Sequence, residues 1–123
     1  MGHITYRILK NLSSNDRKVM ENAFNAIYDE YKYLVFYIAL QYVKEKETAE
    51  DVTNETFMQF FAHKDQIKVP SKIKTYLART SKNLSLNILE MHKREEPLVQ
   101  DVETEEKMDD FMMYMQKFSS YLD

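Results

Sequence analysis

Cysteine and tryptophan are absent from this 123-residue sequence, which also has only one glycine and two prolines. The lack of cysteine excludes a disulfide framework, a cysteine nucleophile and a thiolate metal site. The single glycine, Gly2, excludes the glycine-rich phosphate loops of doubly wound nucleotide-binding folds. Sheet proteins of this length need several glycine, proline or Asn-Gly turns, and too few are present. An all-α protein remains, and we expect a compact bundle of about four helices.

Long apolar runs are lacking too. The longest, at residues 34–40, is far shorter than the ~20 residues that a membrane-spanning helix requires. No secretory signal peptide opens the sequence, so we expect a cytoplasmic protein. The length fits one domain with a single hydrophobic core.

The sequence also lacks catalytic or metal-binding residues at the spacings of known site motifs. The histidines, His3, His63 and His92, have no partner at the spacing of a metal-ligand pair. An enzyme needs a nucleophile, a base and an orienting group, or a metal cluster. We therefore interpret the histidines as surface or rim residues, and we expect neither enzymatic activity nor a cofactor.

Charge is segregated along the chain, although the net charge is only −3. Residues 1–63 have a net charge of −2, residues 64–94 of +6 and residues 95–123 of −7. Because the Debye length is about 10 Å at 0.1 M salt, a bound phosphate responds to its local stretch and not to the whole chain. The basic stretch is either a solvated helix face or an anion-binding surface.

Apolar residues recur every three or four positions from residue 20 to residue 42, which predicts an amphipathic helix. We expect this helix to begin near Ser13 or Ser14, where Ser13-x-x-Asp16 is an N-cap pattern, and to end at the charged segment 44–47. Its predicted buried stripe is Met20, Phe24, Ile27, Tyr31, Leu34, Ile38 and Tyr42.

Three further helices follow in the prediction. Thr48-x-x-Asp51 caps the second, which ends near His63 and turns Ala49, Val52, Thr56, Phe57, Phe60 and Phe61 inward. After a loop at 64–71, Ser71 caps the third, and the segment Glu95-Glu96-Pro97 ends it. Its predicted stripe is Ile73, Leu77, Thr80, Leu84, Ile88 and Met91.

The fourth helix begins near Thr104, after an acidic linker, and carries an apolar stripe at helical spacing. Its residues are Met108, Phe111, Met112, Met115, Phe118 and Leu122. Three coverings remain open for this stripe: the rest of a longer protein, a partner protein, or the chain's own bundle. An uncovered stripe predicts self-association through Met108, Phe111, Met112, Met115 and Phe118.

Two predicted helices carry exposed side chains that could bind a partner. The second helix has a polar face with one flexible apolar residue, which is either solubilising or a docking site for a basic partner helix: Glu50, Asp51, Asn54, Glu55 and Met58. The third helix interleaves cations with an aromatic ring and amides, a combination that suits single-stranded nucleic acid. These residues are Lys72, Lys74, Tyr76, Arg79, Lys82, Asn83 and Asn87. The turn at 64–71 is longer than that of a helix-turn-helix.

At these surfaces the sequence resembles a known family. Residues 49–57, Ala-Glu-Asp-Val-Thr-Asn-Glu-Thr-Phe, resemble the Ala-Glu-Asp-x-x-Gln-Glu-x-Phe signature in region 2 of extracytoplasmic-function (ECF) sigma factors. Residues 76–83 are similar to the family's Trp-Leu-x-x-Ile-Ala-Arg-Asn segment, with Tyr76 in place of Trp. Phe24-x-x-x-Tyr28-x-x-Tyr31 matches the start of the region. The resemblance covers about residues 20–96, and it departs at Asn87-x-x-Glu90, where the family often has Asp-x-x-Arg.

The resemblance implies a helical promoter-recognition domain over residues 1–96. It implies that the acidic helix docks on the clamp helices of the beta-prime subunit of core RNA polymerase through Asp51, Asn54, Glu55 and Met58. It also implies that the following loop and helix bind the non-template strand of the minus-ten promoter element and hold a flipped base. The matching positions are the loop at 64–71, which contains Lys64 and Lys68, and Tyr76, Lys82 and Asn83. The cations and the amide of the same helix add four DNA-binding candidates: Lys72, Lys74, Arg79 and Asn87.

Residues 97–123 are expected to be an acidic linker and an amphipathic helix that begins a truncated region 4, the part that reads the minus-thirty-five element in this family. An antisigma factor is a further partner that the resemblance implies. The alternative to the sigma-factor hypothesis is a helical protein–protein interaction or regulatory module that does not bind DNA.

Overall fold

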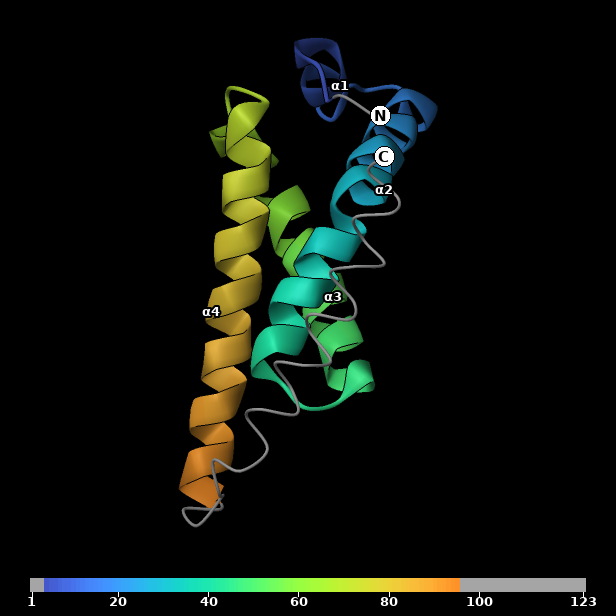
Figure 1. Ribbon diagram of the computed structural model, residues 1–123. Coiled ribbons are helices and arrows are strands. Elements are labelled where there is room, and N and C mark those ends of the chain that lie inside the picture. Colours follow the sequence, from blue (N-terminus) through green and yellow to red (C-terminus); the bar gives the residue numbers. More distant parts are fainter. Residues whose placement is uncertain (1–3, 96–123) are drawn as a thin grey trace.

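A computed structural model describes residues 4–95 (Figure 1). Four α-helices follow one another: α1 (Tyr6–Asn11), α2 (Arg17–Tyr42), α3 (Lys46–Ala62) and α4 (Ser71–Glu95). A short 3-10 helix, η1 (Lys64–Gln66), lies between α3 and α4. The described residues contain no strand, so the predicted all-α class is confirmed. Within the same range no helix is long and apolar enough to span a membrane. The predicted linker and helix at 97–123 lie outside the described residues.

The first long helix begins later than predicted, and a short helix precedes it. Asp16, and not Ser13 or Ser14, is the N-cap of α2: its carboxylate accepts hydrogen bonds from the backbone amides of Lys18 at 3.0 Å and Val19 at 3.3 Å. Ser14 instead accepts a bond from the Asp16 amide at 3.1 Å. The six residues of α1 are too few to show a helical period, which is why the sequence analysis missed them.

Two other predicted caps are also wrong. The α3 helix begins at Lys46, with Glu45 as an N-cap whose side chain makes no capping bond, so Thr48 lies within the first turn. Ser71 is the first residue of α4 and therefore not its N-cap, which would precede the helix. The backbone carbonyls of Val69 and Pro70 accept hydrogen bonds from the amides of Lys72 and Ile73. The predicted end of the second helix near His63 is confirmed.

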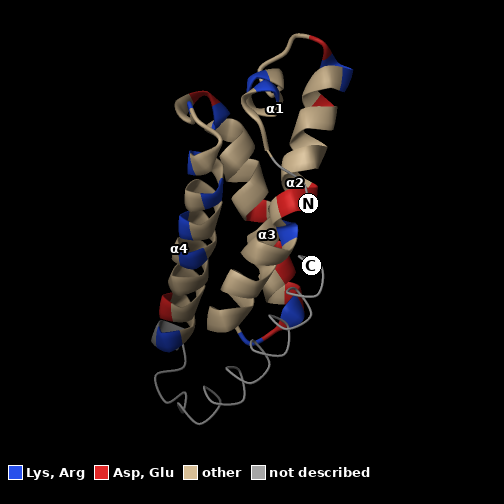
Figure 2. Cartoon of the chain, turned by 45° about the horizontal axis from the view of Figure 1, so that its top comes forward, with Lys and Arg blue, Asp and Glu red and all other residues tan. Residues whose placement is uncertain are grey.

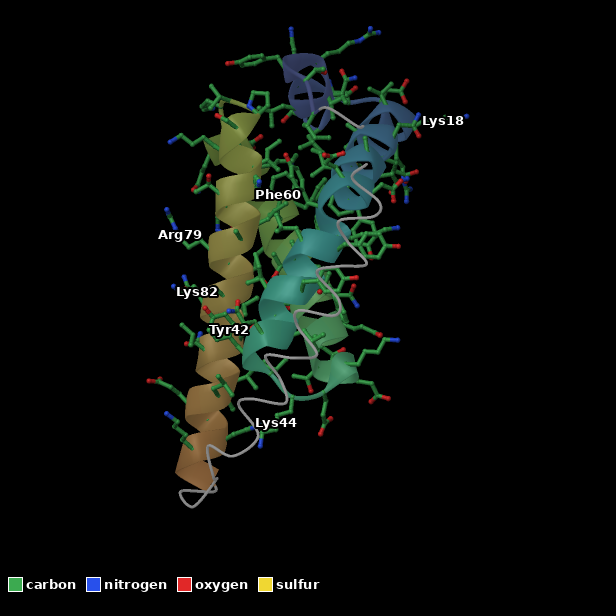
Figure 3. The ribbon with its side chains drawn as sticks, viewed as in Figure 1. Lys18, Tyr42, Lys44, Phe60, Arg79 and Lys82 are labelled. Carbon is green, nitrogen blue, oxygen red and sulfur yellow. The ribbon has the colours of Figure 1, made fainter. Side chains whose placement is uncertain are left out.

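The core lies where α2, α3 and α4 meet, and Phe60 is at its centre (Figure 3). Burying a large apolar side chain contributes roughly 1.5–3 kcal/mol, so this cluster dominates the stability of the bundle. Its largest fully buried apolar members are Leu12, Ile27, Val35, Phe60, Ile73 and Leu77. A second cluster near the α2–α3 connection contains Ala39, Leu40, Val43, Ala49 and Val52.

The buried side of α2 is broader than the predicted stripe, of which Ile27 alone is fully buried. Val35 and Ala39 are completely buried although they lie outside that stripe. The reason is that α2 packs against α1, α3 and α4, which together cover more than one face. Burial also raises the pKa of the Tyr31 hydroxyl above its usual value, and the negative charge of Glu30 adds to this shift.

Two fully buried serines, one helical turn apart on the inner side of α4, differ in their bonding. The Ser81 hydroxyl donates to the Val35 carbonyl at 2.9 Å, whereas the Ser85 hydroxyl has no hydrogen-bond partner among the described residues. We expect Ser81→Ala to lower the free energy of unfolding by about 1 kcal/mol. Ser85→Ala should leave it unchanged or raise it, because burying an unsatisfied hydroxyl costs about 1–3 kcal/mol.

Urea denaturation of the full chain compares the two variants directly, since each removes one oxygen atom from the same helix interface. An equal loss of stability from both substitutions would contradict this account of the interface.

Candidate functional surfaces

The acidic face of α3 consists of residues that are spaced three or four apart and point away from the core. The predicted residues Asp51, Asn54, Glu55 and Met58 are all exposed, and Met58 is 66% exposed. On the opposite side of the helix, Val52 and Phe60 are buried in the core. Because the helix repeats about every 3.6 residues, burial of one side turns the polar residues on the other side outward. Figure 2 colours the acidic positions along α3 red.

Polar groups on this acidic face are largely free to contact a partner. Asp51 and Asn54 make no side-chain hydrogen bond or ion pair with any residue in the described range. Glu55 accepts one long bond, 3.4 Å, from the Gln59 amide group. The buried threonines of α3 bond within the helix instead, Thr53 to the Ala49 carbonyl and Thr56 to the Val52 carbonyl. Only the outer side of α3 thus offers unsatisfied polar atoms.

An apolar groove borders the acidic face, and the sequence analysis missed it. It lies between α2 and α3, has a volume of about 470 Å³, and is lined in part by Met20, Phe24, Met58 and Phe61. The rings of Phe24 and Phe61 meet edge to face with centroids 5.6 Å apart. We call this depression groove A. A partner that docks on α3 thus meets a carboxylate row and an apolar recess side by side.

The basic surface of α4 faces away from the other helices. Arg79 and Lys82 project outward on the far side of α4 from the bundle (Figure 3), and basic residues follow the helix in Figure 2. Lys72, Arg79 and Asn83 are exposed and lie seven and four positions apart, so they form one line along the helix. The exposed Asn87 continues this line one turn further.

Not all the predicted cations belong to that line. Lys74 is exposed but lies two positions after Lys72, which places it on another flank of α4. The Lys64 amino group lies over the ring of Phe61, 4.6 Å from its centroid, at the end of α3. Lys68 is exposed in the turn before α4, next to the buried Ile67 that anchors this turn to the core. The fold therefore distributes the predicted DNA-binding residues over the outer side of α4, a second flank of α4 at Lys74, and the segment between α3 and α4.

Tyr76, a predicted DNA-binding residue, packs against α3 and forms a hydrogen bond with it. The ring is half-buried and its centroid lies 6.2 Å from that of Phe60. Its hydroxyl donates to the Gln59 carbonyl at 3.2 Å, and the same carbonyl lies 2.8 Å from Nδ1 of His63. Tyr76 thus joins the end of the acidic helix to the beginning of the basic one, and its ring is fixed in place.

The described side chains include no candidate metal site. No three histidine, aspartate or glutamate side chains converge there in a way that a metal ion would need. The exposed polar and charged groups of α3 and α4 therefore form the candidate functional surfaces, and both surfaces are suited to binding a partner.

Comparison with known proteins identifies a family for the larger part of the chain. The family model described as Sigma-70 region 2 matches residues 27–95. This range covers more than half of the chain and includes most of α2 together with α3, η1 and α4. A search of the curated proteins and a search of the solved structures each found no match. The matched range carries both the acidic and the basic surface.

Proposed function

The chain belongs to the sigma-70 region 2 family, and we propose that it is a domain of the extracytoplasmic-function group that docks on core polymerase through α3 and binds the minus-ten strand through α4. Members of the family are non-enzymatic factors of transcription initiation, and they bind core RNA polymerase and promoter DNA. The proposal goes beyond family membership in three assignments: the extracytoplasmic-function group, the residues that dock on polymerase, and the contacts with the DNA strand.

The observation that carries this proposal is the separation of two opposite charges on adjacent helices. Both α3 and α4 bury one side in the same core, so their exposed sides point away from that core in different directions. An acidic face suits the basic clamp helices of a polymerase, and a basic face suits phosphates. One small domain can therefore hold a protein on one side and a nucleic-acid strand on the other.

Strand binding divides between phosphate and base contacts. Lys72, Arg79 and Lys82 supply cations on the outer side of α4, and Asn83 supplies an amide that can pair with a base edge. We propose that the turn at 64–71 and the ring of Tyr76 together bind a flipped base. Unstacking a base costs a few kcal/mol, and stacking on an aromatic ring returns about 1–3 kcal/mol. Because these nearly cancel, the domain alone should bind DNA feebly.

Assignment to the ECF group rests on the signature at residues 49–57. Its apolar members Ala49, Val52 and Phe57 are buried, while Asp51 and Glu55 are exposed, as a docking helix requires. We place the end of this domain at residue 96, which the family match to residue 95 supports.

Fluorescence anisotropy of a labelled promoter bubble tests the proposed function. With core polymerase present, the chain should bind the bubble saturably, and without polymerase it should bind at least about 10-fold more weakly, since the strand contacts alone nearly cancel. A bubble with a scrambled minus-ten strand is the matched control. If the chain binds polymerase but never alters DNA binding, it is a regulatory module and the proposal is wrong.

A further inference from the structure

A second depression lies on the same side of the bundle as groove A. It has a volume of about 390 Å³ and is lined in part by Tyr33, Phe36 and Tyr37 of α2 and by Glu50 and Asn54 of α3. We call it groove B. Both grooves are lined by α2 and α3 alone, so α4 covers neither of them. Together they form an apolar and largely aromatic path along the α2–α3 seam.

The two grooves are ordered along the bundle. Groove A lies near the beginning of α2 and the end of α3, and groove B lies nearer to the α2–α3 connection. Their outermost α2 residues, Met20 and Tyr37, are separated by about 26 Å at 1.5 Å per residue. The last described turn of α4 extends past the α2–α3 connection (Figure 1). The chain therefore leaves α4 at the groove B end of this path.

The sequence beyond residue 95 has the length and the pattern to cover the path. Twenty residues, 104–123, span about 30 Å as a helix, close to the length of the seam. The linker 96–103 reaches at most about 26 Å when extended, enough to turn back from α4. The apolar stripe is rich in methionine, which adapts its shape and makes favourable contacts with aromatic rings.

We propose that residues 104–123 dock as an amphipathic helix along grooves B and A, with Met108 near groove B and Phe118 near groove A. Asp109 and Asp110 flank the beginning of the stripe, and groove B is lined by two lysines, Lys32 and Lys46, and by one acid, Glu50. The Lys32 amino group lies 5.2 Å from the centroid of the Tyr33 ring and 3.5 Å from the Asp29 carboxylate, with which it forms an ion pair.

Docking has a consequence for the acidic face of α3, and this consequence rests on the proposed function. Asn54 lines groove B and Met58 lines groove A, and both belong to the proposed polymerase-binding residues. A docked tail and the polymerase therefore exclude each other. The apparent affinity for polymerase falls by the fraction of undocked chains, so a tail that is docked ten times in eleven weakens it about 10-fold. The tail is an intramolecular inhibitor.

The chain contains no cysteine, so engineered cysteine pairs can test the docking without background. Asn25 and Glu50 are exposed residues that line grooves A and B, respectively. In full-length chains at low concentration, the pairs Asn25→Cys with Ser119→Cys and Glu50→Cys with Met108→Cys should oxidise to internal disulfides. The swapped pairs should not, because the two tail positions lie about 16 Å apart and a disulfide needs Cα atoms within about 7 Å.

A pair of Lys82→Cys with Ser119→Cys is the control for random collision, since Lys82 points away from the bundle (Figure 3). Mass spectrometry and non-reducing gels separate internal from intermolecular disulfides. Equal yields from matched and swapped pairs, or disulfide-linked dimers in place of monomers, would overturn the proposal. Dimers would show instead that a second copy fills the grooves.

Phe111→Asp with Met115→Asp then tests the inhibition. This variant should bind core polymerase about 10-fold more tightly than the unaltered chain, because the tail no longer covers α3. An unchanged affinity would overturn the inhibitory role. If neither chain binds polymerase, the proposed function fails, while the disulfide yields still decide whether the tail docks.

Discussion

Reversing two charges on α3, Asp51→Lys with Glu55→Lys, is expected to abolish binding to core RNA polymerase. Both carboxylates are exposed on the side of α3 that faces away from the core. Placing cations against a basic partner costs several kcal/mol for each unfavourable contact. Since about 1.4 kcal/mol changes an affinity tenfold, a loss of more than about 100-fold follows. Biolayer interferometry with immobilised polymerase measures this loss.

Folding should be unaffected by this double reversal. Lysine favours helices about as well as glutamate does, and both positions lie beyond the first turn of α3. The matched control, Asp29→Lys with Glu90→Lys, makes the same change in net charge at exposed positions on α2 and α4. It should retain polymerase binding. A double α3 variant that keeps its helicity, its melting temperature and its polymerase affinity would remove the docking assignment.

Substitutions on α4 are expected to separate phosphate contacts from base reading. Arg79→Ala with Lys82→Ala should weaken binding of the polymerase complex to every promoter bubble by about 25-fold at 0.1 M salt. Each lost phosphate contact changes the salt slope on a single strand by about 0.7, which corresponds to about 5-fold at this concentration. Lys74→Ala, on another flank of the same helix, is the matched control and should change both quantities less.

Asn83→Ala should act on sequence preference alone. An amide that pairs with a base edge contributes about 1–3 kcal/mol of discrimination, so the preference for the minus-ten strand over a scrambled strand should fall by about 5- to 160-fold. The salt slope should stay the same, because no phosphate contact is removed. The competing view is that Asn83 caps or packs within α4. It predicts lower thermal stability with preference unchanged, whereas the exposed position of Asn83 favours base reading.

Sequence alone determined the fold class and most of the inner and outer sides of α3 and α4. The predicted buried stripe of α4 was wrong at Met91, which is 57% exposed because the last turns of α4 extend past the other helices. The scarcity of glycine and proline left helices as the remaining regular structure, and helical spacing depends only on the order of residues. Phe60, Ile73 and Leu77 could therefore be assigned to the core, and Asp51 and Arg79 to the surface, before any contact was known. The ordered motifs at residues 49–57 and 76–83 likewise pointed to the family that matches residues 27–95.

Only the tertiary structure decided which sides of different helices meet. The bond from Tyr76 to the Gln59 carbonyl and that from Ser81 to the Val35 carbonyl join residues 17 and 46 positions apart, and no local period encodes them. Grooves A and B exist because α2 and α3 lie side by side and neither α1 nor α4 contributes to the lining of their seam. The N-caps at Asp16 and Glu45 also depended on competition between nearby starting points for each helix. Periodicity is a property of neighbours along the chain, whereas surfaces and grooves arise from packing across it.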